Sequence, residues 1–119
     1  MNIEAFTRQY METALWSSTD QNGNPLDDQC TIDDISSETR SQMTADCARF
    51  ISDSMHLLDQ VPAGYTSSDA GHDFWLTRCG HGAGFWDGDC EPVGDQLTEA
   101  CKAFPNVDLY IGDDGKIYS

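Results

Sequence analysis

The sequence predicts an α+β fold in which two N-terminal helices precede a small, mostly antiparallel sheet. In the first half of the chain, apolar residues recur every three or four positions. In the second half, short aromatic or alternating runs are separated by glycine. The predicted order is α-α-β-β-α-β-β, with the helices packed on one face of the sheet. A length of 119 residues fits one domain spanning residues 1–119.

The first predicted helix begins after Asn2, whose side chain suits an N-cap, and ends near Leu15 or Trp16. Its apolar face is formed by Ile3, Phe6, Tyr10 and Ala14. An acidic segment rich in Ser, Asp, Asn and Gly follows at about residues 17–31. Because connections of this length are uncommon in compact domains, we expect either a mobile loop or a functional surface loop.

The second predicted helix has the clearest pattern in the chain. Ser36 or Ser37 can cap its start, and the Val-Pro-Ala-Gly segment at residues 61–64 ends it. Its apolar stripe consists of Met43, Cys47, Phe50, Ile51 and Leu58. Such a stripe predicts a helix that buries one face against the rest of the protein.

Residues 72–78 are predicted to form a strand that returns, after a glycine-rich turn at residues 79–84, through a second strand starting at Phe85. The first strand would place Phe74, Leu76 and Arg78 on one face and Asp73, Trp75 and Thr77 on the other. We therefore expect Trp75 and Trp86 to pair across the two strands in the core, with Arg78 neutralising Asp73 or Asp87.

The C-terminal part is predicted to contain a third helix and a hairpin. Pro92 suits the first helical turn, and the apolar face would be Val93, Leu97, Ala100, Cys101 and Phe104. Val107, Leu109 and Ile111 alternate as a buried strand face. The Asp-Gly pair at residues 114–115 then predicts a tight turn into a last strand at residues 116–118.

The charge and the cysteines restrict the classes of function. The chain has 21 Asp and Glu against six Lys and Arg, a formal charge of −15 that is spread evenly. Direct nucleic-acid binding is disfavoured, since it depends on cations that replace the phosphate counterions. Five cysteines without a CxxC pair are typical of reduced thiols in a cytoplasm. Secretion and membrane insertion are disfavoured, because the chain has no apolar run of the required length.

The segment GHDFWLTRCGHGAGFWD at residues 71–87 resembles the core motif of a family of small uncharacterised proteins encoded by bacteriophages and prophages. Other parts of the chain resemble the same family. They are ALWSS (residues 14–18), PLDD (25–28), IDDIS (32–36), the predicted short helix at residues 97–104 and the DLYIGDDGKIY end (108–118). The resemblance implies a phage context and the cytoplasm of an infected bacterium, without a particular activity. Family members usually carry Asn in place of Cys79, which argues against a role for that thiol.

Two patterns of candidate chemistry involve the cysteines. Cys79, His81 and Cys90, with His72 as a fourth ligand, have the donor types of a zinc site, but their spacing is not a standard one. Cys79 with His81 or His72, oriented by Asp73, has the residue types of a nucleophilic site. The surrounding carboxylates disfavour a thiolate. We therefore predict no catalytic residue, metal or other cofactor.

Glycines at positions 80, 82, 84 and 88 are a third candidate, since glycine lets backbone amides approach a phosphate. A phosphate-binding loop would also have a Lys and a Ser or Thr after its glycines, and this segment has neither. We therefore favour a simple turn in which glycines occupy left-handed backbone conformations.

Two groups of residues are candidates for binding a partner. One group belongs to the 71–87 motif: His72, Asp73, Trp75, Arg78, His81, Trp86 and Asp87. The other is acidic: Asp27, Asp28, Asp33 and Asp34. These carboxylates do not have the spacing of an EF-hand loop, but they could imitate a row of DNA phosphates.

The leading hypothesis is a phage accessory protein that binds and modulates a host protein with a basic, nucleic-acid-binding surface, as in a restriction or CRISPR complex. Fast, electrostatically steered association would occlude the groove of that protein. Two alternatives stay open: a metal- or thiol-dependent module around His72, Cys79 and His81, and a structural protein that associates with itself.

Overall fold

In a computed structural model, which describes residues 1–81 and 83–119, four α-helices and one antiparallel pair of strands confirm a mixed α+β class. The helices are α1 (Ile3–Ser17), α2 (Ser37–Leu58), α3 (Ser67–Arg78) and α4 (Gly94–Ala100), and the strands are β1 (Tyr110–Ile111) and β2 (Ile117–Tyr118). Four 3₁₀ turns join them: η1 (Leu26–Asp28), η2 (Ile32–Asp34), η3 (Phe85–Asp87) and η4 (Cys101–Ala103). The described chain is elongated, 44 × 25 × 25 Å.

Polar side chains define where three of the helices begin. The Asn2 side chain accepts a hydrogen bond from the Ala5 amide, and the Ser36 side chain accepts one from the Thr39 amide, as the sequence predicted. The third helix begins with a capping box, in which Thr66 and Asp69 each accept a hydrogen bond from the other's backbone amide.

The predicted strand at residues 72–78 is wrong, because this segment is the second half of α3. The alternation of apolar residues is misleading here, since α3 is buried on several sides at once. Its buried residues are Ala70, Gly71, Asp73, Phe74, Trp75, Leu76 and Arg78. A helix that is covered around most of its circumference has no single polar face and therefore no clear 3.6-residue period. In the predicted layout of two helices followed by β-β-α-β-β, the helix α3 thus takes the place of the first strand.

The return strand predicted at Phe85 is also wrong. These residues form η3, and Trp86 is 39% exposed while Trp75 is only 1% exposed. The two tryptophans therefore do not pair across strands in the core. The fourth helix begins at Gly94, so Pro92 lies before the helix rather than in its first turn.

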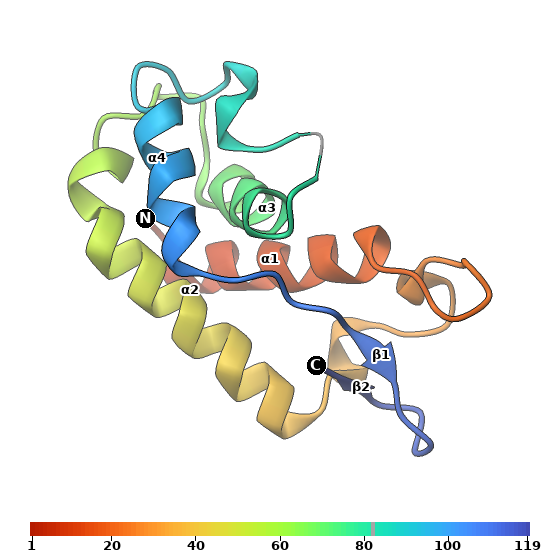
Figure 1. The fold of residues 1–119 in the computed structure, drawn as a ribbon. Helices are drawn as coiled ribbons and strands as arrows, with labels where there is room; N and C mark the ends of the chain where they lie inside the picture. Colours follow the sequence, from red (N-terminus) through yellow and green to blue (C-terminus); the bar gives the residue numbers. More distant parts are fainter. Residues whose placement is uncertain (82) are drawn as a thin grey trace.

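Helices α1 and α3 lie directly against each other (Figure 1). Gly71 permits this approach, because a Cβ atom at this position would overlap the Phe6 carbonyl of α1. Around the contact lies an aromatic cluster in which the Phe50 ring of α2 stacks on the Phe74 ring of α3 with centroids 4.2 Å apart. Its other members are Phe6, Tyr10, Trp75, Phe85 and Phe104. Large aromatic rings thus form the centre of the core, and aliphatic side chains and cysteines complete it.

The C-terminal turn predicted from the Asp-Gly pair is present, but the strands beside it are short. Tyr110 pairs with Tyr118 and Ile111 with Ile117, and Gly115 occupies a left-handed position with φ of +81°. Instead of a four-stranded sheet covered by helices, the described residues form this one hairpin and two isolated bridges, Thr19 with Pro25 and Ile35 with Ile117. In Figure 1 the hairpin lies beside the N-terminal end of α2, far from α4.

The acidic segment after α1 is anchored at several points. The Leu26 side chain is fully buried, and the Asp20 carboxylate accepts hydrogen bonds from the amides of Asn22 and Asn24. The mobility expected for the segment at residues 17–31 remains a prediction. No helix among the described residues combines the length and the apolar character required to cross a membrane.

Candidate functional site

The α3 helix, the connection before it (residues 62–65) and the segment at residues 87–89 line an open pocket of about 510 Å³, which we call the acidic pocket. Its lining consists of Pro62, Gly64, Tyr65, Asp69, His72, Asp73, Asp87 and Asp89. Asp69 and Asp73 share one face of α3 because they are four residues apart. Three motif residues proposed as partner contacts, His72, Asp73 and Asp87, therefore line the same cavity.

Asp73 is the buried carboxyl group of this pocket, with a residue exposure of 6%. The Tyr65 hydroxyl donates a hydrogen bond to Asp73 Oδ2 over 2.5 Å. Burial raises the pKa of Asp73 to about 6, and the charges of Asp87 and Asp89 add to the rise. The hydrogen bond from Tyr65 and the nearby His72 act in the opposite direction. Burial and the bond to Asp73 also raise the pKa of Tyr65, which therefore stays protonated.

His72 is oriented by α1 rather than by the pocket. Its Nδ1 lies 3.0 Å from the Thr13 hydroxyl, which in turn accepts a hydrogen bond from the Gln9 side-chain amide. The Thr13 hydroxyl thus orients the imidazole ring from the side of α1. The exposed Trp16 ring stacks on the imidazole with centroids 5.8 Å apart.

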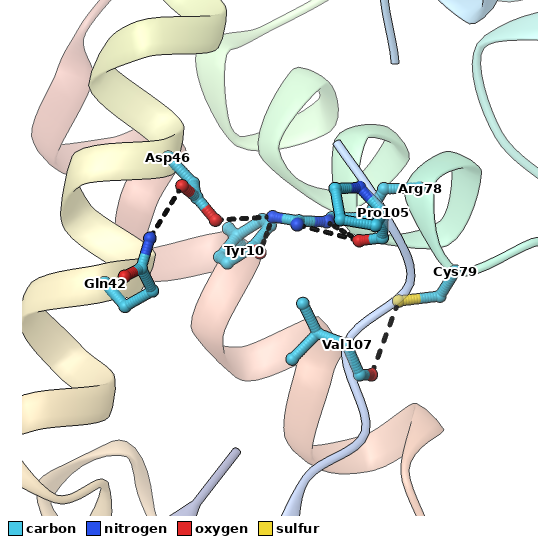
Figure 2. A network of polar contacts seen from close by, with 7 residues as sticks. All are labelled: Tyr10, Gln42, Asp46, Arg78, Cys79, Pro105 and Val107. Carbon is cyan, nitrogen blue, oxygen red and sulfur yellow. Dashed lines mark hydrogen bonds and ion pairs between the residues drawn. The ribbon is translucent and has the colours of Figure 1, made fainter. Parts of the chain in front are cut away.

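Arg78, another residue of the 71–87 motif, belongs to the core and is only 8% exposed. Its guanidinium donates to Asp46 Oδ2 at 2.8 Å, to the Tyr10 hydroxyl at 3.0 Å and to the Pro105 carbonyl (Figure 2). The expectation that Arg78 neutralises Asp73 or Asp87 is therefore wrong. Trp75 is buried as well, and its indole donates to the Ser17 hydroxyl at 2.7 Å.

His81 and Trp86 line a separate hollow of about 360 Å³ together with Lys102 and Phe104. The Trp86 ring covers Gly84, where a Cβ atom would collide with the indole and with the Thr77 hydroxyl. The motif thus supplies side chains to two different surfaces, with its central part in the core between them.

The acidic group Asp27, Asp28, Asp33 and Asp34 lies on the turns η1 and η2. Asp27, Asp28 and Asp33 are exposed, whereas the Asp34 carboxylate accepts a hydrogen bond from the Thr31 amide at 2.8 Å. Asp34 therefore helps to shape the turn, and the other three face solvent.

The candidate metal and thiol residues do not converge. Cys79 donates weakly to the Val107 carbonyl over 3.8 Å, and Cys90 is fully buried with its thiol 2.9 Å from the Phe85 carbonyl. Burial raises the pKa of both thiols, that of Cys90 to about 11. Over residues 1–81 and 83–119, no three His, Cys, Asp or Glu side chains are arranged to hold a metal ion.

Three lining residues of the acidic pocket escaped the sequence analysis: Tyr65, Asp69 and Asp89. The Thr-x-x-Asp pattern at residues 66–69 signals a helix start and would have indicated α3. Tyr65 and Asp89 have no such local signal, because they enter the pocket from loops.

Comparison of the chain with protein-family models, with curated proteins and with solved structures gave no match.

Proposed function

We propose that this protein is a phage-encoded accessory protein that binds a host protein and occupies its basic, nucleic-acid-binding surface. The observation that carries the proposal is an acidic surface that the chain does not neutralise with its own cations. Four of the six basic side chains among the described residues pair with carboxylates: Arg8 with Glu12, Arg49 with Asp53, Arg78 with Asp46, and Lys102 with Glu99. A fifth, Arg40, donates to the Ile32 carbonyl.

The remaining carboxylates are numerous and well distributed. Of the 21 acidic residues, 17 make no ion pair with a described residue, since only four pairs form. Exposed ones occur on every part of the fold, from Glu4 on α1 to Asp113 in the hairpin. A basic partner therefore meets negative charge from many directions of approach.

The charge spacing supports the comparison with DNA. A formal charge of −15 along a 44 Å axis corresponds to about one net charge every 3 Å. Phosphates follow one another at about 3.4 Å along one strand of a duplex. The protein as a whole thus has a little over half the linear charge density of a duplex, which carries one charge per about 1.7 Å of its axis. The mechanism is electrostatic steering, fast association and steric exclusion of nucleic acid.

The test is an affinity capture from host lysate at low and high salt, followed by binding measurements on the protein identified. We expect the affinity for that protein to fall steeply with salt and duplex DNA to compete for the same surface. Binding that responds to neither salt nor DNA contradicts the mimicry.

Matched variants show which end of the molecule makes the contact. A triple variant, Asp27→Asn, Asp28→Asn and Asp33→Asn, removes three exposed charges near the hairpin. The control, Glu4→Gln, Asp59→Asn and Asp95→Asn, removes three exposed charges elsewhere. A larger loss in association rate for the first triple places the contact at η1 and η2, and equal losses indicate that only net charge matters.

A further inference from the structure

Strand β1 has a neighbouring strand on one edge only. Its partner β2 is flanked on both sides, since it pairs with β1 and its Ile117 carbonyl accepts a hydrogen bond from the Ser36 amide at 2.9 Å. Ile35 forms a parallel bridge to Ile117 on that same side. The outer edge of β1 has no strand beside it among the described residues. A free edge of this kind can take up a further strand.

The backbone groups of Ile111 point to this free edge. In an antiparallel pair, opposed residues alternate between hydrogen-bonded and non-hydrogen-bonded pairs, and the Gly112 amide donates to the Lys116 carbonyl at 2.8 Å. Ile111 and Ile117, one step along, therefore form a non-hydrogen-bonded pair whose amides and carbonyls point away from each other. The bond from Ser36 to the Ile117 carbonyl agrees with this assignment. Among the described residues, no backbone group of another segment bonds to the Ile111 amide or carbonyl.

A pocket of about 540 Å³ lies beside this edge, and we call it the hairpin groove. The hairpin contributes Tyr110, Ile111 and Asp113 to its lining, and the segment after α1 contributes residues 19–22 and Gln29. Figure 1 shows that segment (orange) and the hairpin (blue) on the same side of the molecule. The groove therefore lies where a strand added to β1 would run, since neighbouring strands are about 4.8 Å apart.

The hairpin groove is negatively charged and has an aromatic wall. Asp113 is exposed, and the Asp20 carboxylate is held in place by three hydrogen bonds from its own segment. No Lys or Arg is among the described residues that line the groove. Tyr110 is 55% exposed, and its ring stacks on Tyr118 with centroids 5.9 Å apart. Carboxylates and an accessible aromatic ring both attract the side-chain cation of a Lys or Arg.

We propose that the free edge of β1 is an interaction surface for an extended, basic segment of a partner protein, which adds to the hairpin as a third strand. The backbone of that segment bonds to the amide and carbonyl of Ile111, and its Lys or Arg side chains lie against the two carboxylates and the Tyr110 ring. A second copy of this chain is a poor occupant, because two chains of charge −15 repel each other. The inference is independent of the proposed DNA mimicry, which depends on the charge of the whole surface and needs no free strand edge.

Binding of a synthetic peptide, Lys-Val-Lys-Val-Lys-Val-Lys, to the full chain tests the proposal. The matched control peptide has the same sequence with every backbone amide N-methylated, which keeps the charge and the side chains but prevents close pairing with a strand edge. We expect the control peptide to bind at least about tenfold more weakly, because its backbone hydrogen bonds to Ile111 are lost. In NMR spectra the largest amide shifts caused by the parent peptide should occur at Tyr110, Ile111 and Gly112, and exchange of the Ile111 amide should slow.

Two charge variants locate the contact. Asp113→Asn removes an exposed carboxylate of the hairpin groove, and Asp95→Asn removes one from α4, which lies far from the hairpin in Figure 1. We expect the first to weaken binding of the parent peptide about two- to fivefold, the range for one exposed charge pair, and the second to weaken it less.

Four results would overturn the proposal. The parent peptide does not bind, or the N-methylated peptide binds equally well, since charge alone then explains the attraction. Both charge variants weaken binding to the same extent, so that the groove has no special part in it. The Ile111 amide becomes protected from exchange as the protein concentration rises without peptide, because a second copy of the chain then occupies the edge.

Discussion

The Arg78 guanidinium on α3 donates to Asp46 Oδ2 on α2 over 2.8 Å, although the two residues are 32 positions apart. The side chain of Arg78 is 3% exposed and that of Asp46 is 15% exposed. The same guanidinium also donates to the Tyr10 hydroxyl of α1 and to the Pro105 carbonyl (Figure 2). One side chain thus connects three helices and the C-terminal segment, and this explains why a motif arginine lies in the core.

Replacing Arg78 by Met should lower the free energy of unfolding by about 3–5 kcal/mol, because a half-buried carboxylate, a tyrosine hydroxyl and a carbonyl lose their donor together. Urea denaturation measures the change. The control Arg8→Met removes an exposed pair with Glu12 and should change stability by no more than about 0.5 kcal/mol. Equal effects of the two substitutions would show that the buried network contributes little.

Gly71→Ala should destabilise the protein by about 1–3 kcal/mol, since the added methyl group forces α1 and α3 apart at Phe6. The sign is diagnostic, because the same substitution inside an unobstructed helix is usually stabilising. Gly64→Ala is the control: it meets no atom within 4 Å and should be neutral or slightly stabilising. Thermal or urea unfolding of both variants checks the pair.

Asp73 should make global stability depend on pH in the direction opposite to most carboxyl groups. Its folded pKa of about 6 lies above the ordinary 3.8, so its contribution is fully present below about pH 4 and is lost as the pH rises through 6. Compared with Asp73→Asn, the unaltered protein should lose on the order of 2–3 kcal/mol between pH 3.5 and 7.5. A difference between the two proteins that stays constant over this range would contradict the raised pKa.

The cysteines should react with a thiol reagent slowly and in a defined order. Burial raises the pKa of Cys47 and Cys101 to about 12, whereas Cys79 is partly exposed and its pKa rises less. At pH 8 we expect Cys79 to be alkylated first and the buried thiols only on unfolding, when all five become equal. Mass spectrometry of tryptic peptides follows each site. Rapid alkylation of Cys47 or Cys101 in the folded protein would be inconsistent with this core.

Local signals in the sequence were sufficient where a residue acts on its own neighbours. Asn2 and Ser36 cap helices through amides three residues away, and the Asp-Gly pair turns the chain into β2 within one hairpin. The Thr66–Asp69 capping box belongs to the same class, and greater weight on it would have identified α3 as a helix. These contacts depend only on backbone conformation and short side-chain reach.

The sequence by itself determined the acidity, the helix caps and the terminal turn, because these depend on composition or on residues a few positions apart. The tertiary structure decided which sides of α3 are buried: contacts with α1 and with the aromatic cluster cover it around most of its circumference, and this removes its visible period. It also decided that Arg78 pairs with Asp46, and that Tyr65, Asp69, Asp73, Asp87 and Asp89 share one pocket. Those pairings join distant segments, and no spacing along the chain encodes them.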